Sequence, residues 1–202
     1  MAANIMVRSK LPARRKVDPQ DSYKKYRKEL REDFNNSCGY CGDSDERCDK
    51  SIFHIDHFAP QSLFPELALD YANLVYSCRY CNVSKSNHWL GTDSSVANDG
   101  ISGFVDPCDQ NYDVHLGRSS SGRICANTKV GAYIVKRLKL HLLRHELLWK
   151  SRRMRELRVH LDDLIEEIKL RKEPNRDQLL ALLEKHRDLT RKIDEYERGA
   201  YA

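Results

Sequence analysis

Two pairs of cysteines, CGYC and CRYC, constrain the fold of this chain more than any other feature of its sequence. The pairs are Cys38 with Cys41 and Cys78 with Cys81, and 36 residues separate them. Four thiolates are the closed ligand set of a structural zinc site. The separation is longer than in a zinc ribbon, so a folded element must be inserted between the pairs. A Zn²⁺ ion would then tie together the two ends of a small insert that has little core of its own.

The other three cysteines, Cys48, Cys108 and Cys125, have no partner at ligand spacing. The total of seven is odd, and the N-terminal stretch MAANIMVRSKLPARRK lacks the apolar core of a secretory signal, so we expect no disulfide framework. We interpret these three as buried small hydrophobic residues. No apolar run approaches the ~18 residues of a membrane span. We therefore expect a cytoplasmic protein with no membrane partner.

The insert contains HIDHFAP, residues 54–60, a short run rich in groups that titrate or bind metal. We expect a strand over residues 51–57, a second strand at LVYSC and a helix from RYC onward. Alternation along a strand places His54 and Asp56 on one face and His57 on the other. His57 can join Asp56 at one site only if the strand ends there, which Pro60 favours.

Residues three apart share a face of the expected helix. Cys78 and Cys81 would point to the zinc. Arg79, Asn82 and Lys85 would occupy a face rotated by about 100°. One helix could thus hold the cysteine clamp on one side and present an amide and two cations on the other.

These side chains suit the hydrolysis of a phosphodiester. Asp56 and Asn82 offer the hard oxygen ligands that Mg²⁺ or a similar divalent cation prefers. A neutral imidazole at His57 can take a proton from water near pH 7. Lys85 or Arg79 would contact phosphate. The cation would steady the scissile phosphate and the leaving oxygen.

This combination resembles the HNH endonucleases, the ββα-metal group that includes the HNH module of RNA-guided CRISPR nucleases. The family pattern is an Asp-His pair, a later Asn, and a final His or Asn shortly before a Lys. Here the matching residues are Asp56 and His57, Asn73 in YANLVYSC, and Asn82 with Lys85 in CNVSK. The flanking cysteine pairs match the zinc-stapled subgroup, and the likeness covers about residues 35–90.

The resemblance implies a role for each matching residue. His57 would be the general base. Asp56 and Asn82 would bind the catalytic cation, and Asn73 would pin the loop that carries His57. His54 could be a further ligand, a residue bonded to a ligand, or simply a polar strand residue. Such enzymes typically leave 5′-phosphate and 3′-hydroxyl ends, and family habit favours DNA.

The expected fold is α+β, with a small ββα-metal core preceded by a basic helix and followed by a helical hairpin. Residues 1–18 resemble a flexible basic arm. Residues 19–127 would form the nuclease domain, with a basic helix at 19–34 and a β-hairpin extension near its end. Apolar residues at helical spacing over 128–202 predict two antiparallel helices that dock a partner or form a homodimer.

The formal net charge of +5 is concentrated near the N-terminus, where residues 1–31 hold ten Lys and Arg against three acids. Such a run favours polyanions, since neutralising phosphates releases counterions, although it could equally be a solvated arm. The residues that we expect to contact nucleic acid are Arg14, Arg15, Lys16, Lys24, Lys25 and Arg79.

Other interpretations stay open. A zinc-stabilised module that binds nucleic acid without catalysis could use the basic arm and residues 136–158, and it would need neither Asp56 nor His57. An adaptor with two zinc ions would want about eight ligands, and this chain offers four paired cysteines. More loosely, GFVDPCDQNYDVH and the helical tail look similar to stand-alone HNH proteins of bacterial phage-defence cassettes, some of which work beside an ATPase.

A second metal site is the less favoured interpretation of the acidic stretch after residue 105. Asp-Pro and Asn-Tyr-Asp clusters more often make turns. The residues concerned are Asp106, Asp109, Asp113 and His115.

Overall fold

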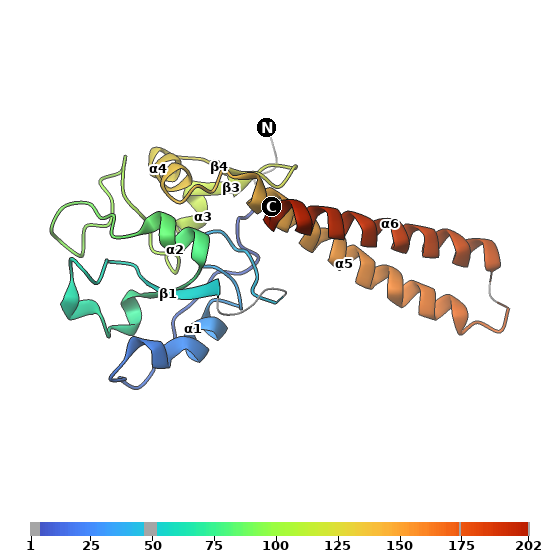
Figure 1. Ribbon diagram of the computed structural model, residues 1–202, viewed down its shortest axis with the longest axis horizontal. Helices are drawn as coiled ribbons and strands as arrows, with labels where there is room; N and C mark the ends of the chain where they lie inside the picture. Colours follow the sequence, from blue (N-terminus) through green and yellow to red (C-terminus); the bar gives the residue numbers. More distant parts are fainter. Residues whose placement is uncertain (1–4, 47–51, 174, 202) are drawn as a thin grey trace. The chain divides into compact units, whose positions relative to one another are not determined.

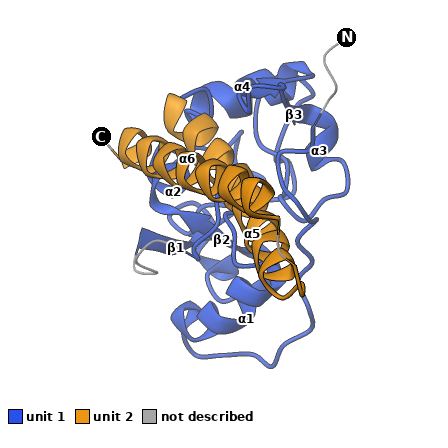
Figure 2. Ribbon diagram, turned by 90° about the vertical axis from the view of Figure 1, so that its right-hand side faces the viewer, with its two compact units in different colours: residues 1–142 blue, residues 143–202 orange. Residues whose placement is uncertain are grey.

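The structure, a computed structural model, describes residues 5–46, 52–173 and 175–201. The chain divides into two compact units (Figure 2). Unit 1 comprises residues 1–142 and contains every residue that the sequence assigns to the site. Unit 2 comprises residues 143–202.

The centre of unit 1 is a two-stranded antiparallel sheet with a helix packed on it (Figure 1). Strand β1 spans Phe53–His57 and pairs with β2, Leu74–Cys78, in a register that places Asp56 opposite Val75. All of β2 is buried, as its apolar composition requires. Helix α2, Arg79–Lys85, begins directly after β2. This arrangement confirms the predicted ββα core.

The segment between the two strands contains two short 3-10 helices. They are η3 (Pro65–Leu67) and η4 (Tyr71–Asn73). Asp70 caps η4, because its side chain accepts a hydrogen bond from the backbone N–H of Ala72. The backbone is irregular directly after His57, so β1 ends at that residue. This is the strand end that His57 requires in order to join Asp56 at one site.

The basic helix begins later than Pro19. A 3-10 turn, η1 (Tyr23–Tyr26), leads into α1 (Arg27–Asp33), which packs against β2. The backbone N–H of Gln20 donates to the Tyr26 hydroxyl at 2.8 Å, so the residues before the helix are tied to it. Leu30 of α1 is fully buried and belongs to the same hydrophobic core as the strands.

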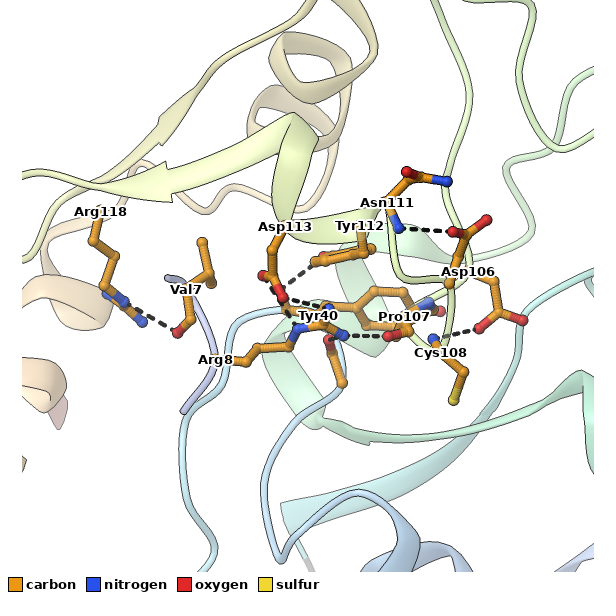
Figure 3. A network of polar contacts seen from close by, with 12 residues as sticks. Val7, Arg8, Tyr40, Asp106, Pro107, Cys108, Asn111, Tyr112, Asp113 and Arg118 are labelled. Carbon is orange, nitrogen blue, oxygen red and sulfur yellow. Dashed lines mark hydrogen bonds and ion pairs between the residues drawn. The ribbon is translucent and has the colours of Figure 1, made fainter. Parts of the chain in front are cut away.

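The expectation of a flexible arm over residues 1–18 is wrong for the part that the structure describes. Val7 and Arg8 are buried, and Ile5 forms an antiparallel bridge with Arg118. Arg8 donates to the carbonyl oxygen of Pro107 and pairs with the Asp113 carboxylate (Figure 3). A guanidinium is buried only where its donors find acceptors, and here the acceptors hold the N-terminal segment across the domain.

The extension after the core begins with helix α3, Tyr112–His115. The predicted β-hairpin follows as β3 (Leu116–Arg118) and β4 (Ile124–Ala126). Arg118 is buried and donates to the carbonyl oxygen of Cys41 at 2.9 Å. The extension thus holds the backbone of the first cysteine pair from outside.

Helix α4, Lys129–Arg137, also belongs to unit 1, so the boundary expected at residue 128 is displaced. The Thr128 side chain caps the helix by accepting a hydrogen bond from the backbone N–H of Gly131. A Cβ at Gly131 would lie 2.0 Å from the carbonyl oxygen of His115. This close approach, which requires glycine, packs the start of α4 against the end of α3.

Unit 2 is a pair of long helices, α5 (Leu143–Lys169) and α6 (Arg176–Tyr201), that pack along each other. Within it Arg155 pairs with Glu197, and the Ser151 hydroxyl donates to Glu197 at 2.8 Å. The hairpin is as predicted, but it starts at residue 143. Among the described residues, no helix has both the length and the apolar character needed to cross a bilayer.

Candidate active site

The four paired cysteines converge in the structure. All are buried, and their sulfur atoms lie within 4.8 Å of one another. Cys41 Sγ and Cys78 Sγ are 3.9 Å apart. A tetrahedral ion with Zn–S bonds of about 2.3 Å requires sulfurs separated by about 3.8 Å. The cluster therefore fits a structural zinc ion, as predicted.

The remaining cysteines differ from one another. Cys108 is half-buried, which approximates the prediction, but Cys125 is exposed and the prediction for it is wrong. On β4 only Ile124 is buried, and both Cys125 and Ala126 are exposed. Cys48 lies outside the residues that the structure describes.

Asp56 is buried at the end of β1 and is held on two sides. The Tyr40 hydroxyl donates to its Oδ2 at 2.6 Å, and Lys85 Nζ lies 3.3 Å from the same oxygen. Burial raises the pKa of Asp56, while the positive charge of Lys85 and the Tyr40 hydrogen bond oppose that rise. Burial and the Asp56 charge raise the pKa of Tyr40 well above its usual value, so Tyr40 remains a hydrogen-bond donor.

Lys85 does not project toward solvent. Its side chain is 0% exposed, and Nζ donates to the carbonyl oxygen of His57 at 2.7 Å. Burial lowers its pKa, which the neighbouring Asp56 carboxylate opposes. The predicted contact between Lys85 and phosphate is therefore corrected: the lysine joins α2 to the end of β1, beneath the site.

His57 has a defined tautomer. Its Nε2 lies 3.0 Å from the carbonyl oxygen of Ala68. A carbonyl can only accept, so Nε2 carries the proton in the neutral ring and Nδ1 carries a lone pair. In the described part of the chain no hydrogen bond engages Nδ1. The His57 ring also makes an edge contact with Tyr23, at 4.9 Å between centroids.

Asn73 makes the side-chain to backbone hydrogen bonds expected of it. Its Oδ1 accepts from the N–H of Ala59 at 2.7 Å, and its Nδ2 donates to the carbonyl oxygens of Ala59 and Leu67. These bonds fasten both ends of the segment that follows His57. Asn73 thus helps to place Ala68, the partner of His57.

Asn82 and His54 face each other from α2 and β1. Asn82 Nδ2 and His54 Nδ1 are 2.9 Å apart. Since an amide nitrogen can only donate, His54 Nδ1 accepts, and the Asn82 Oδ1 is turned away from this contact. Of the three interpretations of His54, this geometry favours a residue hydrogen-bonded to a candidate ligand, Asn82.

The predicted ligands and base line one hollow of about 220 Å³. Asp56, His57 and Asn82 all contribute to its wall. Its polar groups are one carboxylate, one imidazole, amides and hydroxyls, a set of few hard donors that fits Mg²⁺ with part of its water shell. The other lining residues are Ile55, Pro60, Gln61, Ser62, Ser86 and Asn87.

Comparison with known proteins points the same way as this geometry. Residues 38–88 match the family described as HNH endonuclease. The chain carries an HNH endonuclease domain. The Septu protein PtuB of Bacillus thuringiensis is 36% identical over 61 residues, which is 29% of this chain and 23% of that protein. The chain thus matches less than a quarter of that relative's length. No solved structure gives a significant match.

Two arginines outside the HNH domain that were expected to contact nucleic acid form ion pairs within unit 1. Arg14 is largely buried, and its NH1 lies 2.9 Å from a carboxylate oxygen of Asp106. Arg15 pairs with Asp33 and Glu32. These pairs hold the N-terminal segment on unit 1. Burial takes Arg14 out of the set expected to contact phosphate, whereas the Arg15 side chain is 46% exposed and its contact with nucleic acid stays a prediction.

The other predicted cations are exposed. Lys25 pairs with Asp21 at 2.8 Å, one helical turn away, a contact that solvent weakens. In the described structure Lys16, Lys24 and Arg79 are exposed. Their contact with nucleic acid stays a prediction.

The acidic stretch after the HNH domain is used for turns and ion pairs. Asp106 accepts from the N–H of Cys108 (Figure 3), and Asp109 accepts from the N–H of Asn111. Asp113 pairs with Arg8 at 2.9 Å. Among the described residues these acids and His115 form no metal-binding group. The turn interpretation is the one that holds.

Two tyrosines of the site were missed at the level of sequence. Tyr40 lies between the first two cysteines and reaches Asp56; Tyr23 lies in η1 and reaches His57. The position of Tyr40 inside CGYC could have drawn attention, because a residue there must be close to the zinc-tied strands. Nothing in the spacing of Tyr23 indicates its contact.

Proposed function

We propose that this chain is a metal-dependent endonuclease that hydrolyses phosphodiester bonds, with DNA as the favoured substrate. The observation that supports it most is the state of His57, whose Nε2–H is used by Ala68 while Nδ1 is unbonded in the described chain. The same ring lines a hollow with Asp56 and Asn82. A base beside donors for a hard cation is the equipment that phosphodiester hydrolysis requires.

In this mechanism His57 removes a proton from water at Nδ1. The water oxygen attacks phosphorus, and the bond from phosphorus to the leaving 3′ oxygen breaks. That oxygen takes a proton from solvent water, so the products are a 5′-phosphate and a 3′-hydroxyl. The Ala68 carbonyl keeps accepting from Nε2, so it stabilises the imidazolium that forms. Asn73 acts by position, because it fixes the segment that presents this carbonyl.

Asp56 and Asn82 would hold the cation, and the bound cation would neutralise charge on the scissile phosphate and the leaving oxygen. Tyr40 and Lys85 orient Asp56 from behind. Since each occupies part of the carboxylate's accepting capacity, the remaining lone pairs are those available to the hollow. His54 orients the Asn82 amide in the same way.

The deciding experiment is a cleavage panel. Single- and double-stranded DNA and RNA are incubated with the wild-type protein and with His57→Ala in Mg²⁺, in Mn²⁺ or in EDTA. We expect cleavage that needs the added cation and that His57→Ala abolishes. Equal cleavage by His57→Ala would exclude His57 as the base, and binding without cleavage by the wild-type protein would favour the non-catalytic module instead.

We also propose that the nuclease acts in a defence system, with a partner such as an ATPase, in the cytoplasm. This rests on the partial match to the Septu protein PtuB. The element proposed for docking or self-association is the α5–α6 hairpin, whose leucines at 157, 170, 180 and 183 are exposed. Light scattering of the full chain tests the homodimer: a dimer mass that Leu180→Lys with Leu183→Lys reduces to a monomer would support it, and a monomeric wild type would exclude it.

A further inference from the structure

A second, larger hollow adjoins the one lined by His57. It measures about 630 Å³, within the range of sites that hold small organic ligands, and shares Ile55 and Asn82 with the first hollow. Its other described lining residues are Tyr23, Lys24, Arg27, Phe53 and His54. Because the two hollows share part of a wall, a substrate whose phosphate lies in the first would extend into the second.

The chemistry of this larger hollow is aromatic and cationic. Tyr23 is partly exposed and lies at the junction, since its ring also contacts His57. Lys24 is exposed, and no polar contact involves its amine in the described chain. Arg27 is anchored to the carbonyl oxygen of Phe53 at 2.9 Å. Of the described lining residues, two are cationic and none is acidic.

We propose that this hollow binds an unpaired nucleotide next to the scissile phosphate, with its base against Tyr23 and its phosphate at Lys24. An aromatic ring beside a cation is how proteins bind single-stranded nucleic acid irrespective of sequence, because every base has a π-face. A paired base cannot enter without leaving its stack. This inference rests on the proposed function and adds a preference for unpaired strands, supplied by η1, outside the HNH domain.

The test measures binding, so it does not depend on cleavage. The full chain carrying His57→Ala is titrated, in buffer without added divalent cation or chelator, against labelled dT12, a 12-residue abasic strand of equal charge, and a 12-base-pair duplex. We expect dT12 to bind about 10-fold more tightly than the abasic strand, since stacking one base contributes that much. Fluorescence anisotropy gives each dissociation constant.

The variants separate the base contact from the phosphate contact. Tyr23→Ala should remove the preference for dT12 over the abasic strand and over the duplex, and Tyr23→Phe should retain both. Lys24→Ala should weaken both single strands equally and reduce the salt slope by about 0.7. Lys28→Ala, an exposed lysine on α1 that does not line the hollow, is the matched control and should leave the slope unchanged.

Each outcome supports or overturns the proposal. Should Tyr23→Ala fail to fold, Tyr23→Leu replaces it, because leucine keeps apolar bulk without a ring. A preference for dT12 that survives loss of the ring overturns the nucleotide site, as does identical behaviour of Lys24→Ala and Lys28→Ala. If the wild type cleaves nucleic acid and none of these variants changes binding, the nucleotide site is overturned and the proposed nuclease function stands. If binding depends on the Tyr23 ring but the wild type cleaves no substrate, the nucleotide site stands and the proposed nuclease function is overturned.

Discussion

Two regions of unit 1 contain metal-binding residue types, and they are built in opposite ways. The cysteine cluster is closed, with four buried sulfurs within 4.8 Å of one another. The hollow beside His57 is open, about 220 Å³ in size, with one carboxylate among amides and hydroxyls. A closed set of soft ligands suits an ion that stabilises a fold, whereas a few hard donors suit one that keeps water and substrate in its shell.

The two regions nevertheless share their supporting elements. Helix α2 carries Cys81 on one face and Asn82 on the next. Tyr40 lies between two cysteines of the cluster and donates to Asp56. The cluster can therefore position the hollow without taking part in its chemistry. The comparison predicts that damage to the cluster removes the fold and damage to the hollow removes catalysis alone.

The largest expected effect is that of opening the cluster. Cys81→Ser should lower the melting temperature by about 10 °C or more, or abolish cooperative unfolding, because binding of a structural zinc is folding free energy. Circular dichroism measures this, and elemental analysis should find one zinc ion per wild-type chain. Cys125→Ser, at an exposed cysteine, is the control and should melt like the wild type. A stable, zinc-free Cys81→Ser protein would refute the division of roles.

Removal of the base should affect only catalysis. His57→Ala should slow cleavage by about 10²- to 10⁴-fold, the usual contribution of a general base, with little change in the melting temperature. His141→Ala makes the same substitution at an exposed position of unit 1 and should retain full activity. Equal losses of stability in His57→Ala and Cys81→Ser would remove the distinction between the two regions.

Lys85 lies beneath the hollow and should behave as a structural residue. Lys85→Met leaves the Asp56 carboxylate and the His57 carbonyl without their buried cation, which should cost about 3–5 kcal/mol of unfolding free energy in urea denaturation. Lys28→Met, at an exposed lysine, should change stability by less than about 0.5 kcal/mol. If Lys85→Met instead weakened only substrate binding, the lysine would be a phosphate contact after all.

The sequence predicts a feature of these regions well when the residues that determine the feature lie close to it along the chain. The spacing of the cysteine pairs is enough to predict that their four sulfurs cluster. Pro60 indicates correctly that β1 ends near His57. The faces of α2 were predicted from helical geometry, and Asn82 does reach β1. The HNH-like spacing of Asp56, His57 and Asn82 likewise led to one hollow. Each of these signals lies within a few residues of the feature that it predicts.

The failures concern cations whose partners are distant in sequence. Arg8 and Arg14 resemble members of a solvated basic run, but they bind carboxylates at Asp113 and Asp106, about a hundred residues away. Lys85 follows a family pattern, yet its burial depends on how α2 packs on β1. Charge density in a sequence shows how many cations there are. It does not show which of these cations form internal ion pairs in the folded protein.

A substitution at Tyr40 gives the finest test of the difference between the cysteine cluster and the hollow, because Tyr40 belongs to both regions. Tyr40→Phe keeps the ring and removes the hydroxyl that donates to Asp56 at 2.6 Å. We expect the Mg²⁺ concentration for half-maximal cleavage to rise about 10-fold, since residues that orient a metal ligand typically contribute 10- to 100-fold to metal affinity. Zinc content should stay at one ion per chain.

The matched control is Tyr112→Phe, which removes a buried hydroxyl from the same neighbourhood. The Tyr112 hydroxyl donates to the backbone carbonyl of Tyr40 at 2.8 Å and does not bond Asp56 (Figure 3). Each variant should lose about 1–2 kcal/mol of stability, but only Tyr40→Phe should change the Mg²⁺ dependence. If both variants shift it equally, the cluster influences the hollow through the general rigidity of the CGYC turn, and the single hydrogen bond to Asp56 has no separate role.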